Sequence, residues 1–374
     1  MPCLDEAETV GTCIRKAREA IEAHDLVAEI IVADNGSRDG SREIASSLGA
    51  RVVPVETKGY GAALLAGIAA ARGRYVIMAD ADDSYDFRAI FPFVERLRES
   101  HDLVMGNRFA GGILPGAMPW KHRWIGNPIL TAIGRLFFRS RAGDFHCGMR
   151  GFSREAFERM ELRTTGMELA SEMVIKATLK GMAITEVPVV LSPAGRTRPP
   201  HLRSWRDGWR HLRFMLLFSP RWLFLLPGVV MLVAGSLAAA ILTQGPVILG
   251  GAVLDIHTLL VAVFIALLGF QLVVFAVFAK AWIIREGLHP SHSTLDRFRG
   301  YVSLESGVFL GIGFFAVGLL LLGFAVAGWS RVEFGQLDPR QTMRQVIPAV
   351  GLMMLGAQVV FASFLLSVLA LKPR

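Results

Sequence analysis

Four long apolar segments in the second half of the chain constrain its fold more than any other feature. They cover residues 222–243, 259–280, 306–329 and 346–371. Each has the roughly 20 apolar residues that a helix needs to cross about 30 Å of hydrocarbon. One such segment could be a buried helix of a soluble protein, but four of them predict a membrane domain. They are also too many, and too late in the chain, to be a signal peptide.

Positive charges predict how these segments are oriented. Several arginines precede the first segment, whereas the loop at residues 244–258 has no Lys or Arg. Because cytoplasmic loops carry the excess of basic residues, the first half of the chain should lie in the cytoplasm. The loop after the second segment is again basic, while the third loop mixes charges and supports this orientation only weakly. An even number of spans then predicts a multi-pass protein of the cell membrane with both termini cytoplasmic.

The first 200 residues alternate short apolar runs with segments of helical spacing. Strands are predicted at residues 28–33, 51–55, 75–79, 103–105 and 184–191, and helices at 9–23, 41–47, 61–71 and 89–100. This alternation indicates an α/β domain with a mostly parallel sheet, which we assign to residues 1–200. A strand-to-helix loop follows Met1 at once, so we expect that the first strand begins upstream or that the sheet lacks half a strand.

An amphipathic helix is predicted at residues 201–220, between the α/β domain and a membrane domain at 221–374. One stripe of this helix is apolar and the other is basic: Trp205, Trp209, Leu212 and Leu216 against Arg203, Arg206, Arg210 and Arg213. A helix of this kind lies in the membrane interface. The formal net charge is +8, but the basic residues gather beside the membrane segments and no nucleic-acid module is present. We therefore predict contact with membrane lipids and no nucleic-acid partner.

Three carboxylates follow the apolar run at residues 75–79 within a few positions. They belong to Asp80, Asp82 and Asp83. Open α/β sheets bind their ligands beyond the carboxyl ends of the strands, which is where these side chains should lie. Hard oxygen ligands suit Mg²⁺ or Mn²⁺, and such an ion bridges to substrate phosphates when the protein supplies one or two carboxylates. The alternative is an acidic turn after a strand.

Other motifs occur in a fixed order around these aspartates. Pro2-Cys-Leu4-Asp-Glu6 opens the chain, Ala33-Asp34-Asn35-Gly-Ser follows the second predicted strand, and Lys58-Gly-Tyr-Gly-Ala-Ala comes before the aspartates. In this order the motifs resemble family 2 glycosyltransferases of the GT-A fold. The most similar group is the polyprenyl-phosphate sugar transferases, which include dolichyl-phosphate mannose and glucose synthases. The resemblance covers about residues 1–215.

The resemblance implies a nucleotide-sugar site with a divalent metal. Asp80 and Asp82 match the family's Asp-x-Asp motif, which would hold Mg²⁺ or Mn²⁺. The chain departs from the family at Asp5, Asn35 and Ser84, which replace an asparagine, an aspartate and a glutamine, so base recognition and a third metal ligand stay open. The nucleotide-sugar contacts that the family implies are Pro2, Leu4, Glu6, Asp34, Asn35, Asp80, Ala81, Lys176 and Arg198.

The resemblance also implies a site for an acceptor phosphate. Arginine suits such a site because its planar guanidinium stays charged and pairs with phosphate oxygens. The acceptor-phosphate residues are Arg108, Arg123, Arg196 and Arg203. The implied catalytic residues are Asp82, Arg108, Arg123, Asp144 and Glu168. Asp144 or Glu168 would position sugar hydroxyls, and the sequence does not decide between them.

The reaction that the resemblance implies is an inverting, metal-dependent transfer of glucose or mannose from a UDP- or GDP-sugar to a polyprenyl phosphate. A lipid monophosphate is already an anionic nucleophile at neutral pH, so no strong general base is required. One alternative is a processive membrane polysaccharide synthase, although Phe218 stands where that class carries the glutamine of its Gln-x-x-Arg-Trp motif. Another is a non-catalytic lipid-handling subunit. The sequence leaves the sugar, the lipid chain and a homo-oligomeric state open.

Overall fold

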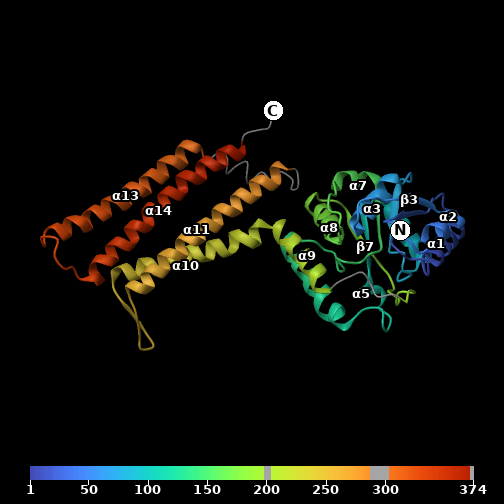
Figure 1. The fold of residues 1–374 in the computed structure, drawn as a ribbon, viewed down its shortest axis with the longest axis horizontal. Helices are drawn as coiled ribbons and strands as arrows, with labels where there is room; N and C mark the ends of the chain where they lie inside the picture. The colour runs from blue at the N-terminus through green and yellow to red at the C-terminus, as the bar shows by residue number, and fades with distance from the viewer. Residues whose placement is uncertain (198–203, 287–302, 371–374) are drawn as a thin grey trace. The chain divides into compact units, whose positions relative to one another are not determined.

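The chain forms two compact units. The structure is a computed structural model that describes residues 1–197, 204–286 and 303–370 (Figure 1). Its two units are Met1–Met215 and Leu216–Arg374. The division places most of the amphipathic helix in the first unit.

A parallel sheet of three strands begins the first unit, with the order β1-β2-β3. β1 has only two residues, and its Pro2 pairs with Ala33 of β2. The predicted strand at 28–33 begins later than expected, at Ile31. The elements of this part are β1 Pro2–Cys3, α1 Val10–Ala23, β2 Ile31–Asp34, α2 Ser41–Ser47, β3 Arg51–Pro54 and α3 Tyr60–Ala70.

A second sheet has the order β4-β6-β5-β7 and is mixed, because β6 runs antiparallel to β4 and β5. Its strands are β4 Tyr75–Met78, β5 Leu103–Asn107, β6 Arg150–Ser153 and β7 Ile184–Pro188. The sequence did not predict β6, since this short segment has neither an apolar run nor a clear alternation. Its Arg150 is fully buried, and the guanidinium donates to three backbone carbonyls, those of Phe145, Cys147 and Ala170. These bonds satisfy the buried donors.

Helices lie between the strands of the second sheet and after its last strand. They are η1 Phe87–Ile90, α4 Phe91–Arg98, α5 Arg108–Gly111, η2 His122–Gly126, α6 Asn127–Phe138, α7 Arg154–Met160, α8 Leu169–Leu179 and α9 Ser204–Leu217. η2 is a π-helical turn that runs directly into α6. α9 lies in the segment predicted to form the amphipathic helix.

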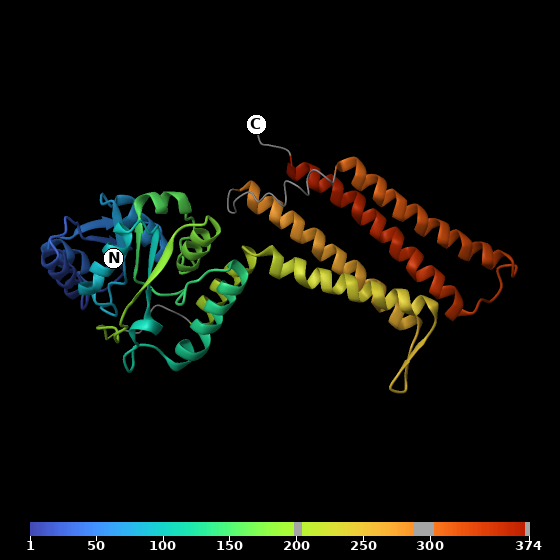
Figure 2. The ribbon, with the colours of Figure 1, turned by 180° about the vertical axis from the view of Figure 1, so that it is seen from behind.

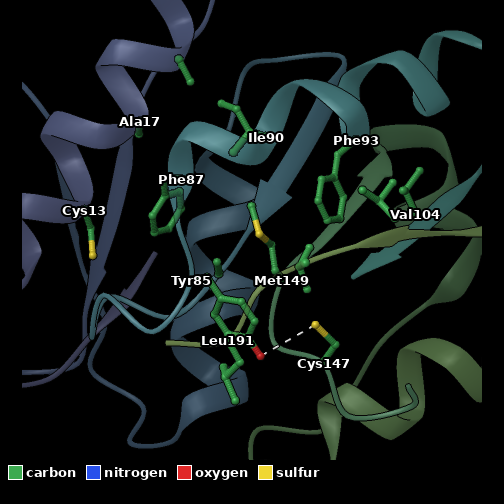
Figure 3. Close-up of a cluster of buried hydrophobic side chains, with 14 of the residues drawn as sticks. Cys13, Ala17, Tyr85, Phe87, Ile90, Phe93, Val104, Cys147, Met149 and Leu191 are labelled. Atoms are coloured by element: carbon green, nitrogen blue, oxygen red, sulfur yellow. Dashed lines mark hydrogen bonds between the residues drawn. The ribbon is translucent and has the colours of Figure 1, made fainter. Parts of the chain in front are cut away.

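The main core of the first unit brings together side chains from helices, loops and one face of the second sheet. Phe87, Phe93, Val104 and Met149 are among its buried members (Figure 3). In the same cluster, the sulfur of Cys147 lies 3.7 Å from the hydroxyl of Tyr85. The Tyr85 hydroxyl also accepts a hydrogen bond of 2.9 Å from the Gly148 backbone. The core therefore anchors the loop after β4 to the loop before β6.

The second unit contains four helices, among the residues that the structure describes, that are long and apolar enough to cross a membrane. These spans are Arg221–Gln244, Ile256–Arg285, Leu304–Ser330 and Pro339–Leu369. The elements are η3 Arg221–Leu225, α10 Leu226–Gln244, β8 Val247–Leu249, β9 Ala252–Leu254, α11 Ile256–Arg285, α13 Leu304–Ser330 and α14 Pro339–Ala370. The predicted architecture is thus confirmed: an α/β unit, an amphipathic helix and four membrane helices.

Glycines allow the membrane helices to pack closely in pairs. A Cβ on Gly269 of α11 would lie 2.3 Å from the backbone nitrogen of Leu232 in α10. Similarly, Gly311 of α13 lies against the backbone of Gly356 in α14. Close backbone approach at small residues is the usual way in which helices associate in lipid. The sequence did not predict the hairpin of β8 and β9, which projects beyond the ends of α10 and α11 (Figure 2).

Candidate active site

Asp80 lies just beyond the end of β4, where the sequence predicted a ligand site. The hydroxyl of Tyr60 donates a hydrogen bond of 2.8 Å to Asp80 Oδ1. A Cβ on Gly148 would lie 2.7 Å from Asp80 Oδ2, so only glycine allows this loop to come so close. Burial, together with the negative charge of Asp82, raises the pKa of Asp80 to about 6. The two carboxylates therefore act on each other electrostatically.

Asp82 is held from two sides. Its Oδ1 accepts hydrogen bonds from the backbone nitrogen and the hydroxyl of Ser84, at 3.1 and 2.6 Å. Its Oδ2 lies 3.2 Å from Nη2 of Arg196, and Nη1 of the same guanidinium pairs with Glu6. The next carboxylate, Asp83, pairs with Lys16 at 2.7 Å. Arg196 thus joins the opening loop to the Asp-x-Asp segment.

The segment that carries Arg196 is fastened over this site by backbone and side-chain bonds. The Gly195 nitrogen donates to the Asp82 carbonyl at 2.9 Å. Thr197 donates to Glu8 from both its backbone nitrogen and its hydroxyl, at 2.7 Å each. Arg196 was expected at the acceptor phosphate, but in the structure its guanidinium pairs with Asp82 of the metal motif and with Glu6. Arg198, predicted to contact the nucleotide sugar, and Arg203, predicted to bind the acceptor phosphate, fall outside the described residues.

The carboxylates at this place fit a hard divalent cation. Asp80 and Asp82 offer oxygen ligands, and Asp82 already bears a cationic partner in Arg196. Within the described ranges, no group of three His, Cys, Asp or Glu residues is arranged to hold a metal ion by itself. Mg²⁺ in nucleotide sites commonly takes one or two carboxylates, and substrate phosphates and water supply the rest.

Two loops beside this site are built from the residues expected near the nucleotide. Asp34 accepts hydrogen bonds from the backbone nitrogens of Gly36 and Ser37, and it thereby closes the turn after β2. The Asn35 amide donates to the carbonyls of Val55 and Thr57, and its oxygen accepts from the Gly59 nitrogen at 2.8 Å. Asn35 therefore shapes the loops through contacts with the backbone.

The opening loop meets the turn after β2. The Glu6 backbone nitrogen donates to the Ser41 hydroxyl at 2.8 Å, and the Asp5 nitrogen donates to Ser37 at the same distance. Pro2 belongs to β1, with Leu4 next to it in the loop, and Ala81 is buried between the two aspartates. The structure thus brings the predicted residues of the opening loop, the β2 turn and the Asp-x-Asp segment together.

Arg108 and Asp144 form an ion pair that is shielded from water. Nε and Nη2 of Arg108 lie 2.6 and 2.7 Å from the two carboxylate oxygens of Asp144. Glu186 supports the same loop, because it accepts from the Gly143 nitrogen and from Asn107. Arg108 was expected to face an acceptor phosphate, and the structure gives it an internal carboxylate as partner.

Arg123 lies in η2, half-buried, with its guanidinium carbon 5.3 Å from the centre of the Trp124 ring. The pKa of the neighbouring His122 is lowered, first by the burial of its ring and then by the positive charge of Arg108. η2 and the Arg108–Asp144 pair are therefore close enough to interact electrostatically. These contacts bring two of the predicted phosphate-binding arginines to one region of the first unit.

The predicted residues of α8 divide into two environments. Lys176 is buried and pairs with Glu172 at 2.8 Å, and its ammonium group also donates to the carbonyl of Glu161. Glu172 in turn accepts from the backbone nitrogens of Arg163 and Thr164. This pair fixes the loop before α8, so Lys176 lacks the open position that a phosphate ligand needs.

Glu168, at the start of α8, is different. Its Oε2 is buried and has no hydrogen-bond partner within the described part of the chain. It belongs to the loop whose Thr165 carbonyl accepts from the Ala62 nitrogen at the start of α3. Buried carboxylate oxygens normally have partners, so this oxygen is available to a ligand that donates hydrogen bonds, such as a sugar hydroxyl.

Tyr60 was not predicted as a site residue, although it touches Asp80. A signal was present, because Tyr60, the first residue of α3, stands between two glycines. A Cβ on Gly61 would lie 2.7 Å from the carbonyls of Thr164 and Gly166. These glycines let α3 approach the loop before α8, and this approach brings the Tyr60 hydroxyl to the carboxylate.

The amphipathic helix α9 is attached to the same region by a polar contact. The Ser171 hydroxyl of α8 lies 2.8 Å from Nδ1 of His211 and 3.3 Å from Nε2 of His146. The two imidazole rings meet edge to face, with their centres 4.6 Å apart. Burial lowers the pKa of both histidines, to about 4 for His211. Both rings are thus neutral at physiological pH.

Comparisons with known proteins match both units. The model of glycosyl transferase family 2 matches residues 1–161, and that of the glycosyltransferase family 2 C-terminal transmembrane region matches residues 277–370. The low-salt glycan biosynthesis hexosyltransferase Agl6 of Haloferax volcanii is 38% identical, over 98% of this chain and 87% of that protein. A dolichyl-phosphate hexose transferase of the same organism is 32% identical, over 50% of this chain and 79% of that protein.

Solved structures resemble the first unit. Glucosyl-3-phosphoglycerate synthase from Mycobacterium tuberculosis, crystallised with Mn²⁺, uridine diphosphate and glucosyl-3-phosphoglycerate, is 26% identical with a TM-score of 0.46. The match covers 58% of this chain and 76% of that chain.

Proposed function

Because the chain belongs to glycosyltransferase family 2 and is a glycosyltransferase of the membrane, we propose that it transfers glucose or mannose from a nucleotide sugar to a polyprenyl phosphate. The product would be a polyprenyl-monophosphate sugar, with inversion at the anomeric carbon. The names of the two Haloferax relatives, a hexosyltransferase and a dolichyl-phosphate hexose transferase, support this proposal. We also infer that the catalytic unit and both termini face the cytoplasm, as the distribution of basic residues predicts.

The observation that carries the proposal is the arrangement of carboxylates after β4. Asp80 and Asp82 follow the strand end, and Arg196 joins Asp82 to Glu6 of the opening loop. When bound, a Mg²⁺ or Mn²⁺ ion held by Asp80 and Asp82 would supply positive charge against the departing nucleoside diphosphate. Arg196 would leave these carboxylates and pair with the same diphosphate, since arginine forms charge-assisted hydrogen bonds with both carboxylates and phosphates.

The remaining residues are assigned to the acceptor and the sugar. Arg123 would bind the lipid phosphate, and its positive charge would offset the repulsion between the acceptor phosphate and the donor diphosphate. Arg108 would add to this positive charge while its pair with Asp144 holds the loop beside the site. Glu168, whose buried oxygen has no partner in the described residues, would accept a hydrogen bond from a sugar hydroxyl.

Sugar transfer by the purified full-length protein in nanodiscs tests this proposal. UDP- and GDP-sugars would be offered with polyprenyl phosphate, with Mg²⁺ or Mn²⁺ or with chelator. We expect one lipid-linked sugar per acceptor, and no product with chelator. Asp82→Asn should reduce the rate by about 100-fold or more, as loss of a group that stabilises developing charge does. The matched control is Asp83→Asn, because Asp83 is adjacent but pairs with Lys16.

Other outcomes would reject parts of the proposal. A lipid-linked chain of several sugars would indicate a polymerising synthase. If the folded protein bound nucleotide but made no product with any donor, the polyprenyl phosphate assignment would be wrong.

A further inference from the structure

Residues 144–148 form a short segment that contacts two charged residues of the candidate active site. At one end, the carboxylate of Asp144 pairs with Arg108 at 2.6 and 2.7 Å. At the other end, Gly148 lies against Asp80, since a Cβ on this glycine would be 2.7 Å from the carboxylate oxygen Oδ2. We call residues 144–148 the linking segment. A displacement of this segment would change the spacing between the Arg108 guanidinium and the Asp80 carboxylate.

The middle of the linking segment is fastened to two helices by one serine hydroxyl. Oγ of Ser171, on α8, lies 3.3 Å from Nε2 of His146 and 2.8 Å from Nδ1 of His211, on α9. The two imidazole rings also meet edge to face, with their centres 4.6 Å apart. The His146 backbone nitrogen donates to Asp144 at 3.4 Å, so the contact continues to the buried ion pair. Three separate parts of the chain thus meet at Ser171.

The Ser171 hydroxyl orders both rings. A serine hydroxyl carries one proton, so it can donate to one imidazole nitrogen while it accepts from the N–H of the other. Both rings are neutral because burial lowers the pKa of each, and a neutral imidazole has one N–H and one bare nitrogen. Ser171 is fully buried, so bulk water does not replace its bonds. The contact therefore fixes the orientation of both rings through complementary hydrogen bonds.

The helix that carries Ser171 also carries a residue assigned to the sugar. Glu168 is the N-cap residue of α8, and its carbonyl accepts from the Ser171 backbone nitrogen at 3.0 Å. Oε2 of Glu168 is buried and has no hydrogen-bond partner among the described residues. Since one hydrogen-bonded turn joins the two residues, a bond that holds Ser171 also holds Glu168.

α9 turns a buried polar side toward this contact. Asp207 and His211 are both buried, and they lie one helical turn apart on the same side of α9. α9 ends at Leu217, and the first membrane span begins at Arg221. His211 therefore ties the helix that leads into the membrane to the linking segment.

We propose that Ser171 and the two histidines are positioning residues for sugar transfer. They set the linking segment and Glu168 relative to α9, the helix that leads into the membrane. A lipid tail keeps the acceptor phosphate at the bilayer, so the residues that receive this phosphate must be held at a defined place relative to the membrane helices. The inference rests on the proposed function, because it concerns transfer to a lipid phosphate.

Two acceptors of different length test this inference on the full-length protein in nanodiscs. One is a long polyprenyl phosphate held in the bilayer, and the other is citronellyl phosphate, which is short and diffuses in water. With Ser171→Ala, we expect kcat for the long acceptor to fall about tenfold or more, because small displacements of positioned groups are costly in rate. The rate with citronellyl phosphate should fall less than about twofold, because a free acceptor can follow the displaced site.

Thr178→Ala is the matched control, because this hydroxyl of α8 donates to the Val174 carbonyl within the helix at 2.7 Å. It should leave both rates near those of the wild type. His211→Asn should retain the rate with the long acceptor, since its amide can take the place of Nδ1. His211→Leu should lose this rate as Ser171→Ala does. Melting temperatures of all variants would ensure that folded proteins are compared.

The remaining outcomes decide against the inference. Equal losses with both acceptors would show that the contact only supports the fold, and unchanged rates with both would show that it has no role in transfer. Equal rates for His211→Asn and His211→Leu would exclude the hydrogen bond as the link. A wild type that used only the long acceptor would leave the decision to these two variants. If the wild type used neither phosphate, the proposed function would fail, and this inference with it.

Discussion

Arg108 grips Asp144 through two parallel hydrogen bonds of 2.6 and 2.7 Å, and both side chains are shielded from water. The two residues belong to separate sequence motifs. Arg108 follows the end of β5, and Asp144 lies in the loop before β6. Their pairing fixes the loop that also carries Cys147 and Gly148 against Asp80. Arg108 therefore has a structural role beside the carboxylate site.

Asp144→Ala should destabilise the first unit strongly. The substitution leaves a buried guanidinium without its carboxylate, which typically costs about 3–5 kcal/mol. We expect a clearly lower melting temperature of the detergent-solubilised protein. Glu99→Ala is the matched control, because its pair with Arg96 is about half exposed and should contribute about 1 kcal/mol or less. Equal melting temperatures for the two variants would show that the buried pair contributes little.

Arg196→Gln should alter metal and donor binding in opposite directions. Without nucleotide, the variant removes a cation that competes for Asp82, so Mn²⁺ should bind about tenfold more tightly, which corresponds to about 1.4 kcal/mol. The KM for the nucleotide sugar should rise, because the diphosphate loses a positive partner. Paramagnetic resonance of free Mn²⁺ and donor saturation curves measure the two effects.

Arg42→Gln is the control for this comparison. Arg42 lies 3.7 Å from Asp34, and its side chain is half exposed, so its loss should change neither value greatly. If Mn²⁺ binding were the same in Arg196→Gln and the wild type, Arg196 would not compete with the ion.

Stability should fall in acid because of the buried histidines. His211 has a pKa lowered from 6.5 to about 4, chiefly by burial, so the unfolded chain binds a proton more readily than the folded protein. This contribution is fully present above pH 6.5 and is lost as the pH falls toward 4. At pH 4.5 the loss from His211 amounts to roughly 2–3 kcal/mol.

Melting temperatures of the wild type and His211→Asn between pH 7.5 and 4.5 measure this effect. Other groups also titrate in this range, so the difference between the two proteins is the relevant quantity. We expect a shallower acid dependence in the variant, which keeps a neutral polar group near Ser171. Parallel curves for the two proteins would contradict the assignment.

Gly269→Ala should weaken the pairing of α10 with α11. The new Cβ would lie 2.3 Å from the Leu232 nitrogen, so the helices must separate, at a cost of roughly 1–3 kcal/mol. Gly323→Ala in α13 is the control, since nothing lies within 4 Å of its Cβ position. It should be neutral or stabilise its helix slightly. Unfolding of both variants in detergent with increasing dodecyl sulfate would reveal the difference, and equal resistance would contradict close packing at Gly269.

Local patterns in the sequence determined the division of this protein into a catalytic unit, an amphipathic helix and four membrane helices. Hydrophobic periodicity and uninterrupted apolar length act within one element, so they can be read without knowing what that element packs against. The position of Asp80 and Asp82 after a strand was likewise a local property. The short strand β6 lacked such a pattern, and it was missed.

Only the tertiary structure decided which side chains meet. Arg196 reaches Glu6 across 190 positions of the chain, and Arg108 finds Asp144 across 36. Lys176 is buried in a pair with Glu172, and Gly134 of α6 packs against the ring of Phe145. Such contacts depend on how strands and loops far apart in the chain are brought together. A charged or apolar residue in the sequence does not reveal by itself whether its partner will be a neighbouring side chain, a ligand or a membrane.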